Sequence, residues 1–155
     1  MSGAQYEDFW DQSVEQFGSV MTAVNANLTP FRDRGGKLIM WNGWSDHSTP
    51  AQGSIAYYEQ LQQRMGGPSQ MAKFARLFLG PGAGHCGGGG RTPERRLGPL
   101  VRWVEDNEPP EFLNAIGWSK ADQAAIRVRP VCPYSQTARY KGRGDTDDAA
   151  NFECR

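Results

Sequence analysis

The sequence lacks the charge excess and the long apolar runs that mark several classes of protein. Its 155 residues include 17 basic and 17 acidic side chains, so no net charge directs the chain toward nucleic acid or an anionic membrane. No run approaches the roughly 18 apolar residues of a membrane span. Met1 is not followed by a secretory signal peptide, although a longer precursor could have carried one. The length fits one domain, and 19 glycines with 10 prolines predict many loops.

Cysteine is scarce as well, since Cys86, Cys132 and Cys154 are the three examples. In an oxidising compartment this odd number implies one disulfide and one cysteine without a partner in these residues. In the cytosol all three would be buried thiols, so the count alone leaves both interpretations open. A Cys132–Cys154 bridge would close the polar C-terminal tail into a loop and stabilise the protein by about 3 kcal/mol.

Two short apolar runs predict buried strands, the first over Lys37–Trp41 and the second over about Ala75–Leu79. The segment between them predicts a helix. Thr49 is expected to cap this helix, with Pro50 at its first position and Gln52 completing a capping box.

Two further helices are predicted from apolar residues spaced three and four positions apart, one before the first strand and one that starts at Thr92-Pro93. The apolar positions are Trp10, Val14, Phe17, Met21 and Val24 in the first helix, and Leu97, Leu100, Val101 and Val104 in the second. The order helix, strand, helix, strand, helix predicts an α/β fold with parallel strands joined by a right-handed crossover.

The last third of the chain has a different character. Residues 126–129 alternate between apolar and polar, as a half-exposed strand does, and the chain beyond Cys132 is polar. We therefore divide the chain into a leading amphipathic helix (residues 1–30), an α/β core (31–130) and a C-terminal tail (131–155).

A side chain that can take part in acid–base catalysis follows each of the two predicted strands. Asp46 lies on the loop after the first strand, and His85 lies on a glycine-rich turn after the second. Open α/β sheets place their sites at the carboxyl ends of strands. An acid followed by a histidine on the next such loop is also the second half of the Ser, Asp, His order of α/β-hydrolases. Asp46 is therefore the candidate acid and His85 the candidate base.

Two other interpretations of these loops are disfavoured. Residues 82–87 formally match the dinucleotide fingerprint Gly-x-Gly-x-x-Gly, but the next helix is expected only at about Thr92, too far for its N-terminus to hold a pyrophosphate. His47, His85 and Cys86 contain no pair at a recurrent ligand spacing, so no metal site is predicted.

Several ordered blocks of sequence resemble the tannase and feruloyl esterase family, from about residue 28 to residue 154. The blocks are residues 34–39 (Arg-Gly-Gly-Lys-Leu-Ile), 43–46 (Gly-Trp-Ser-Asp), 81–86 (Pro-Gly-Ala-Gly-His-Cys), 103–105, 131–134, 138–142 and 147–152. The resemblance implies the C-terminal part of an α/β-hydrolase fold, with a tail closed by a disulfide.

The resemblance also implies roles for individual residues. Asp46 and His85 would be the acid and base of a catalytic triad, and Cys132 and Cys154 would form the C-terminal disulfide of the family. Cys86 would pair with a cysteine that precedes the nucleophilic serine and is missing from these residues.

Other family properties follow as expectations. Ser48 and Thr49 would lie near the mouth of the substrate pocket. Members are secreted or otherwise exported serine esterases that cleave gallate, ferulate or related aromatic esters. No cofactor is expected in this chain, whereas a calcium ion is expected in the lid domain that members insert ahead of the strand preceding the triad acid.

One feature of the family is missing from the sequence. These 155 residues contain neither a Gly-x-Ser-x-Gly elbow nor a Cys-Ser pair, and no serine ahead of Asp46 has a strand, turn and helix around it. The first interpretation is therefore an ester hydrolase present as its C-terminal portion and inactive by itself. The alternative is a non-catalytic remnant or interaction piece that keeps this half of the fold.

The first predicted strand would also carry an open apolar edge, since in a wider sheet it would pair on both sides. We therefore expect the chain to self-associate or to bind a partner chain.

Overall fold

The computed structural model describes residues 1–85, 92–93, 95–118 and 125–155. A parallel pair of strands lies at its centre, formed by β1 (Leu38–Gly43) and β2 (Ala75–Gly80). Both predicted strands are thus present, and each extends to a glycine at its carboxyl end. The chain between them forms α3 (Ala51–Arg64) and the short α4 (Pro68–Met71). The sheet that contains them has two strands among the described residues, so the wider sheet of an α/β-hydrolase stays a prediction.

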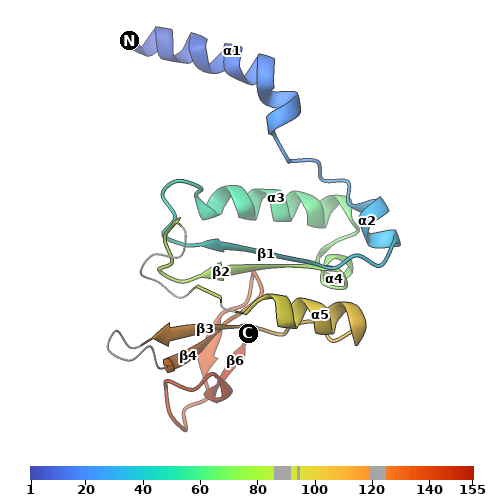
Figure 1. Cartoon of the computed structure of the whole chain (residues 1–155), viewed down its shortest axis with the longest axis vertical. Coiled ribbons are helices and arrows are strands. Elements are labelled where there is room, and N and C mark those ends of the chain that lie inside the picture. Colours follow the sequence, from blue (N-terminus) through green and yellow to red (C-terminus); the bar gives the residue numbers. More distant parts are fainter. Residues whose placement is uncertain (86–91, 94, 119–124) are drawn as a thin grey trace.

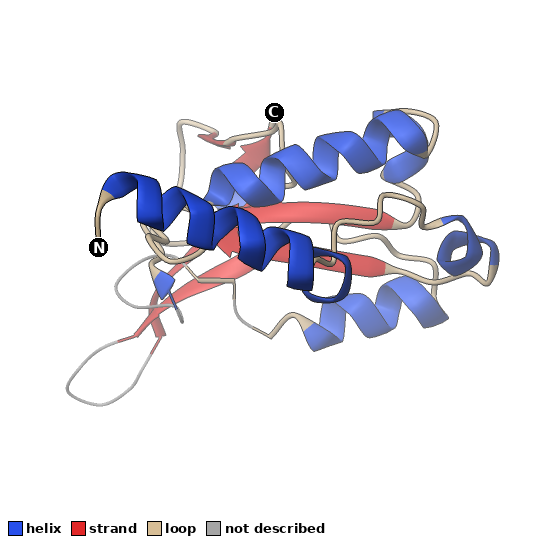
Figure 2. Cartoon of the chain, turned by 90° about the horizontal axis from the view of Figure 1, so that it is seen from above, coloured by secondary structure: helices blue, strands red, loops and turns tan. Residues whose placement is uncertain are grey.

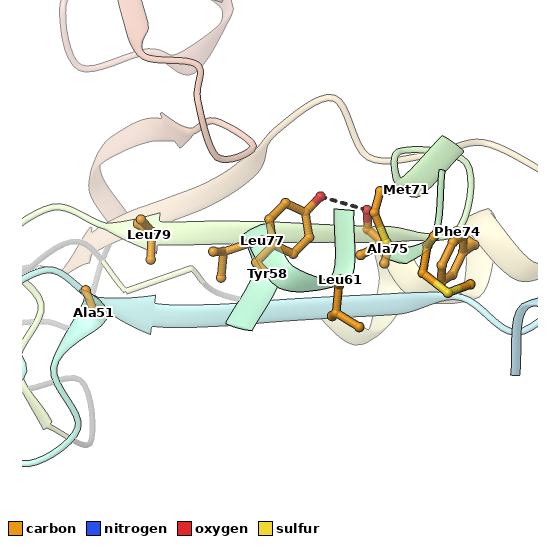
Figure 3. Packing of buried hydrophobic residues seen from close by; sticks show 9 residues of the cluster. Ala51, Tyr58, Leu61, Met71, Phe74, Ala75, Leu77 and Leu79 are labelled. Atoms are coloured by element: carbon orange, nitrogen blue, oxygen red, sulfur yellow. Dashed lines mark hydrogen bonds between the residues drawn. The ribbon is translucent and has the colours of Figure 1, made fainter. Parts of the chain in front are cut away.

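Helices cover the two faces of this sheet, with α3 on one side and α5 (Leu97–Glu105) on the other (Figures 1 and 2). Alternate side chains of a strand point to opposite faces, and here both sets are mainly apolar, with Asn42 and Arg76 as the polar exceptions. On the α3 side, Tyr58 and Leu61 pack with Leu77 in the larger buried cluster (Figure 3). The Tyr58 hydroxyl donates a hydrogen bond to the Ala75 carbonyl at 3.1 Å, which anchors the helix to the strand.

The opposite face is organised around Phe78 of β2 and Trp103 of α5, both fully buried. Trp103 lies beneath two cationic side chains, with the Lys37 amine 5.7 Å and the Arg76 guanidinium 5.6 Å from its ring centre. Trp103 is thus the side chain by which α5 is fixed to the sheet.

The predicted start of α5 was wrong. The helix begins at Leu97 and not at Pro93, because Pro93 forms an isolated antiparallel bridge with Ala115. The aliphatic positions Leu97, Val101 and Val104 are exposed, and the large aromatic ring between them is the buried one.

The leading helix α1 (Gly3–Met21) stands apart from the sheet in Figure 1. Ser2 caps it, and Gln5 completes a capping box. The predicted helix is present, although it ends at Met21, before Val24, the last of the predicted apolar positions. None of its residues, all of which the structure describes, is buried. Its exposed apolar side chains are Tyr6, Phe9, Trp10, Val14, Phe17, Val20 and Met21. The short α2 (Thr29–Asp33) then leads into β1.

Two antiparallel strand pairs follow α5. The first joins β3 (Leu113–Trp118) to β4 (Ala125–Val131). The second joins β5 (Ala138–Tyr140) to β6 (Phe152–Cys154), and the 3-10 turn η2 (Ala149–Asn151) directly precedes β6. The half-exposed strand predicted for residues 126–129 lies within β4. Its partner β3 was not predicted.

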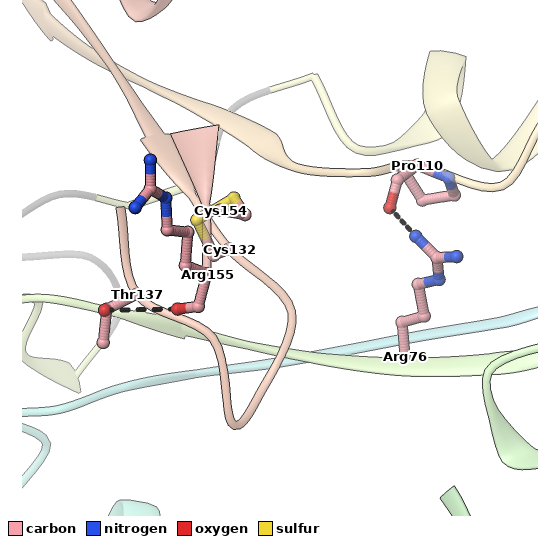
Figure 4. Close-up of a disulfide and its surroundings, with 6 residues drawn as sticks. All are labelled: Arg76, Pro110, Cys132, Thr137, Cys154 and Arg155. Atoms are coloured by element: carbon pink, nitrogen blue, oxygen red, sulfur yellow. Dashed lines mark hydrogen bonds between the residues drawn. A yellow bond between two sulfur atoms is a disulfide. The ribbon is translucent and has the colours of Figure 1, made fainter. Parts of the chain in front are cut away.

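The predicted Cys132–Cys154 disulfide is present, with 5.6 Å between its Cα atoms (Figure 4). The residues directly after Cys132 run along the outer edge of β2. Pro133 forms a bridge with Phe78, and the Tyr134 N–H donates to the Leu77 carbonyl at 2.7 Å. The tail therefore covers one edge of β2.

The other edge of the sheet belongs to β1. Among the described residues β1 pairs with β2 alone, so the backbone on its far side has no strand neighbour. No described helix is both long enough and apolar enough to cross a bilayer.

Candidate active site

The two loops that carry Asp46 and His85 leave the carboxyl ends of β1 and β2 side by side. Their backbones are joined by two hydrogen bonds, from the Trp44 N–H to the Gly80 carbonyl and from the Ser45 N–H to the Ala83 carbonyl, each 3.0 Å long. The parallel register of the strands therefore continues into the loops and fixes their spacing.

A glycine allows this close approach. A Cβ atom built on Gly43 would lie 2.2 Å from the Ala83 carbonyl oxygen and 2.8 Å from its carbonyl carbon. Because these are backbone atoms, no side-chain rotation relieves the contact. Gly43 is thus the residue that lets the two loops meet.

Asn42 at the end of β1 secures the first loop. Its amide nitrogen donates to the Thr49 carbonyl at 3.0 Å and to the Ser54 hydroxyl at 2.9 Å, while its amide oxygen accepts from the Gly43 N–H at 2.7 Å. One side chain thereby ties the strand, the far end of the loop and the first turn of α3 together. The sequence reasoning did not identify Asn42. A polar residue at the end of an otherwise apolar strand was the available signal.

Asp46 and His85 lie in direct contact. The His85 Nδ1 atom is 3.0 Å from Oδ2 and 3.2 Å from Oδ1 of Asp46. The Asp46 side chain is 7% exposed, whereas 47% of the His85 side chain is accessible. The acid is thus enclosed by its own loop, and the ring of the histidine reaches the surface.

The pKa of the Asp46 carboxyl lies well below its usual range, chiefly because the Thr49 backbone N–H donates to it. Burial opposes this effect, but the Thr49 hydroxyl, His85 and the Ser48 N–H add further hydrogen bonds that favour the ionised form. Asp46 is therefore ionised at neutral and mildly acidic pH.

The charge of Asp46 determines which ring nitrogen of His85 carries the proton. An ionised carboxylate only accepts hydrogen bonds, so the Nδ1 atom that faces it must carry a proton. In the neutral ring this leaves Nε2 as the nitrogen that can accept one. The pair can therefore act as a general base at Nε2 with an acid fixed behind it.

The remaining predicted site residues are Ser48, Thr49 and Cys86. Ser48 and Thr49 lie on the Asp46 loop and are exposed. Their backbone N–H groups both donate to Asp46 Oδ1 at 2.9 Å, and their role at a substrate pocket stays a prediction. Cys86 lies outside the described residues, so its predicted disulfide stays a prediction too. In the described parts of the chain, no three or more His, Cys, Asp and Glu side chains form a group that could hold a metal ion.

The predicted capping box at the start of α3 was wrong. Pro50 is the N-cap of this helix, and no side chain caps it. The Thr49 hydroxyl donates instead to the charged oxygen Oδ2 of Asp46, at 2.8 Å.

An ionised aspartate paired with Nδ1 of a histidine, at the carboxyl ends of neighbouring parallel strands, is the arrangement that serine hydrolases use for their acid and base. The family model described as "Tannase and feruloyl esterase" matches residues 2–155. The chain therefore belongs to the tannase and feruloyl esterase family.

Individual relatives are ester hydrolases by name. The chain is 48% identical over 136 residues to a mono(2-hydroxyethyl) terephthalate hydrolase of Piscinibacter sakaiensis, a match that covers 85% of this chain and 22% of the relative. It is 38% identical over 154 residues to a probable feruloyl esterase of Arthroderma benhamiae, covering 97% of this chain and 28% of that protein.

Solved structures of similar proteins agree with this assignment. Feruloyl esterase B from Aspergillus oryzae aligns with a TM-score of 0.72 at 27% identity, covering 84% of this chain and 29% of that one. Tannin acyl hydrolase from Aspergillus niger aligns with a TM-score of 0.76 at 25% identity, covering 93% of this chain and 27% of that one. The chain thus spans less than a third of the length of these relatives.

Proposed function

We propose that this chain supplies the acid and the base of a serine carboxylic ester hydrolase, and that it corresponds to the C-terminal part of an α/β-hydrolase fold. The observation that carries the proposal is the contact between the enclosed Asp46 carboxylate and His85 Nδ1, 3.0 Å long, at the ends of two paired parallel strands. Membership of an esterase family supports the same reaction class.

In the proposed mechanism, His85 Nε2 accepts the proton of a serine hydroxyl as that oxygen attacks the ester carbonyl. The ring becomes an imidazolium, and the adjacent negative charge of Asp46 stabilises it. His85 then gives the proton to the departing alcohol, and a water molecule repeats the sequence to release the acid. Asp46 keeps its negative charge throughout.

The serine itself comes from outside these residues, because the sequence contains no Gly-x-Ser-x-Gly elbow. Ser45 precedes Asp46 on the same loop, and α3 begins only at Ala51, so the sharp strand-to-helix turn of an elbow is missing there. The backbone donors of an oxyanion hole beside the nucleophile would come from the same absent segment.

The proposed substrates are small aromatic, chiefly phenolic, esters. The names of the similar proteins, a feruloyl esterase, a terephthalate monoester hydrolase and a tannin acyl hydrolase, support an aromatic acyl group. The pocket that selects among such esters would be completed by a lid domain, where we also expect any calcium ion to bind.

We propose that the protein works outside the cytoplasm, as a secreted or periplasmic enzyme. The Cys132–Cys154 disulfide supports this, since such bonds persist mainly in oxidising compartments.

We propose further that the chain associates with another polypeptide, either a second copy or a chain that carries the serine. The unpaired edge of β1 and the exposed apolar side chains of α1 support this. A free strand edge can pair with a strand of another chain, and an exposed apolar face gains free energy when it is buried.

A chimeric enzyme tests the proposed reaction. The segment of the Piscinibacter relative that matches this chain is replaced by the chain, and hydrolysis of methyl ferulate and of a terephthalate monoester is measured. We expect turnover by the chimera and none by the isolated chain. A chimera that folds but does not turn over either ester would favour the alternative, a non-catalytic remnant of the fold. Turnover by the isolated chain, lost in His85→Ala, would place the serine within these residues and refute that part of the proposal.

A further inference from the structure

We propose that Thr49 is a positioning residue for the acid–histidine pair, holding the Asp46 oxygen that faces His85. The inference rests on the proposed function, since it assigns a role within the same pair. It concerns the hydroxyl of Thr49 and not its backbone.

The two oxygens of Asp46 are held in different ways. Oδ1 accepts two backbone hydrogen bonds, from the N–H groups of Ser48 and Thr49, each 2.9 Å long. Oδ2 lies closer to His85 Nδ1, at 3.0 Å, and accepts the Thr49 hydroxyl at 2.8 Å. The backbone thus fixes one oxygen, while a side chain fixes the other, which is the one nearer the histidine.

This arrangement determines the plane of the carboxylate. With Oδ1 alone held, rotation about the Cβ–Cγ bond would carry Oδ2 away from the ring nitrogen. The Thr49 hydroxyl removes that freedom, and as a donor it also favours the ionised form of the acid. A positioned acid in turn keeps the proton of His85 on Nδ1, which is the tautomer that leaves Nε2 ready to act as a base.

Thr49 is itself well anchored for this task. Its carbonyl accepts from the Asn42 amide at 3.0 Å, and its own N–H is engaged by Asp46. Asn42 is joined in turn to Ser54 of α3 at 2.9 Å. The hydroxyl therefore projects from a backbone that is tied both to the strand and to the following helix, as the support of a functional group should be.

The experiment measures the tautomer of His85 directly. The full chain, labelled with ¹⁵N in its histidines, is examined by NMR at about pH 9, where histidine rings are ordinarily neutral. The chain contains two histidines, so the exposed His47 serves as an internal reference in every spectrum. Thr49→Val removes the hydroxyl while keeping the shape of the side chain, and Thr49→Ser restores it.

Thr137→Val is the matched control, because it makes the same chemical change at an exposed threonine on the tail, where the hydroxyl bonds to the Arg155 carbonyl at 3.4 Å. We expect His85 to be mainly protonated at Nδ1 in the unchanged chain, in Thr49→Ser and in Thr137→Val. In Thr49→Val, the ratio of Nδ1–H to Nε2–H tautomer should fall about fivefold toward that of His47.

Each outcome has a distinct meaning. An unchanged His85 ratio in a folded Thr49→Val would overturn the positioning role and leave the acid–histidine pair intact. A His85 ring that resembles His47 already in the unchanged chain would instead refute the pair and, with it, the proposed function. If Thr49→Val does not fold, failure of Thr49→Ser to keep the ratio would equally overturn the inference.

Discussion

The close approach of the two loops at Gly43 gives the sharpest structural prediction. Replacing Gly43 by alanine places a methyl group 2.2 Å from the Ala83 carbonyl oxygen, where an ordinary contact needs about 3.4 Å or more. The loops must therefore separate by about 1 Å, which stretches the bond between the Ser45 N–H and the Ala83 carbonyl. Overpacking of this kind costs about 1–3 kcal/mol, and the displaced loop is the one that carries His85.

Urea denaturation of the full chain measures the cost, with Gly53→Ala as the matched control. Gly53 lies in the first turns of α3, and a Cβ atom there meets nothing within 4 Å. Alanine at that position should stabilise the helix by up to about 1 kcal/mol, because it reduces the freedom of the unfolded chain. Glycine-to-alanine substitution is thus expected to lower the free energy of unfolding at Gly43 and to raise it at Gly53.

The acid–histidine pair should also respond to the Gly43→Ala substitution. In Gly43→Ala, the His85 tautomer ratio should move toward that of His47, since the acid and the histidine no longer keep their 3.0 Å contact. A Gly43→Ala chain as stable as the unchanged one, with an unaltered His85 spectrum, would refute the claim that this glycine sets the spacing of the loops.

The remaining predictions concern stability and assembly. Replacing Cys132 and Cys154 by serine should lower the free energy of unfolding by about 3 kcal/mol, and equal urea midpoints with and without a reductant would contradict this. Leu61→Ala should cost about 2–5 kcal/mol because Leu61 is fully buried, whereas the exposed Gln60→Ala should cost little. The lowered pKa of Asp46 stabilises the fold above the pKa of an unfolded aspartate, about 4, and this contribution is lost on acidification. The stability advantage of the unchanged chain over Asp46→Asn should therefore shrink between about pH 5 and pH 2, and a constant difference would contradict the assigned cause. Size-exclusion chromatography across a dilution series should show association, and a monomer at every concentration would refute it.

The central strands were predictable because both carry apolar side chains on their two faces, although β2 is buried and β1 is half-buried up to Gly43. Lys37–Trp41 and Ala75–Leu79 read as continuous apolar runs, which is how a strand covered on both sides must read. Their order with the intervening helix also placed Asp46 and His85 at the same end of the sheet. That these two side chains touch is a consequence of the parallel register, which the order of elements implied and the structure describes.

Other features were not predicted because the local sequence pattern was compatible with more than one arrangement. Thr49 precedes Pro50 and Gln52 as a helix cap would, yet it also lies three residues after Asp46, and its hydroxyl donates to that charged carboxylate. Trp103 was missed because the aliphatic residues around it have helical spacing, although the aromatic ring offers more area to bury.

The strand β3 was missed for a different reason. It contains Asn114 and Gly117, both of which disfavour strands, and it forms through its pairing with β4. Pairing of this kind cannot be read from the sequence of the paired segment alone.

The central claim, that Asp46 and His85 act as acid and base in ester hydrolysis, is tested most directly by the kinetics of the chimera. The measurement is kcat/KM for methyl ferulate in the unchanged chimera and in His85→Ala, Asp46→Asn and His47→Ala. We predict that Asp46→Asn loses about 10⁴-fold and His85→Ala at least as much, while His47→Ala keeps its activity. An active chimera whose kcat/KM is unchanged by His85→Ala would contradict the account.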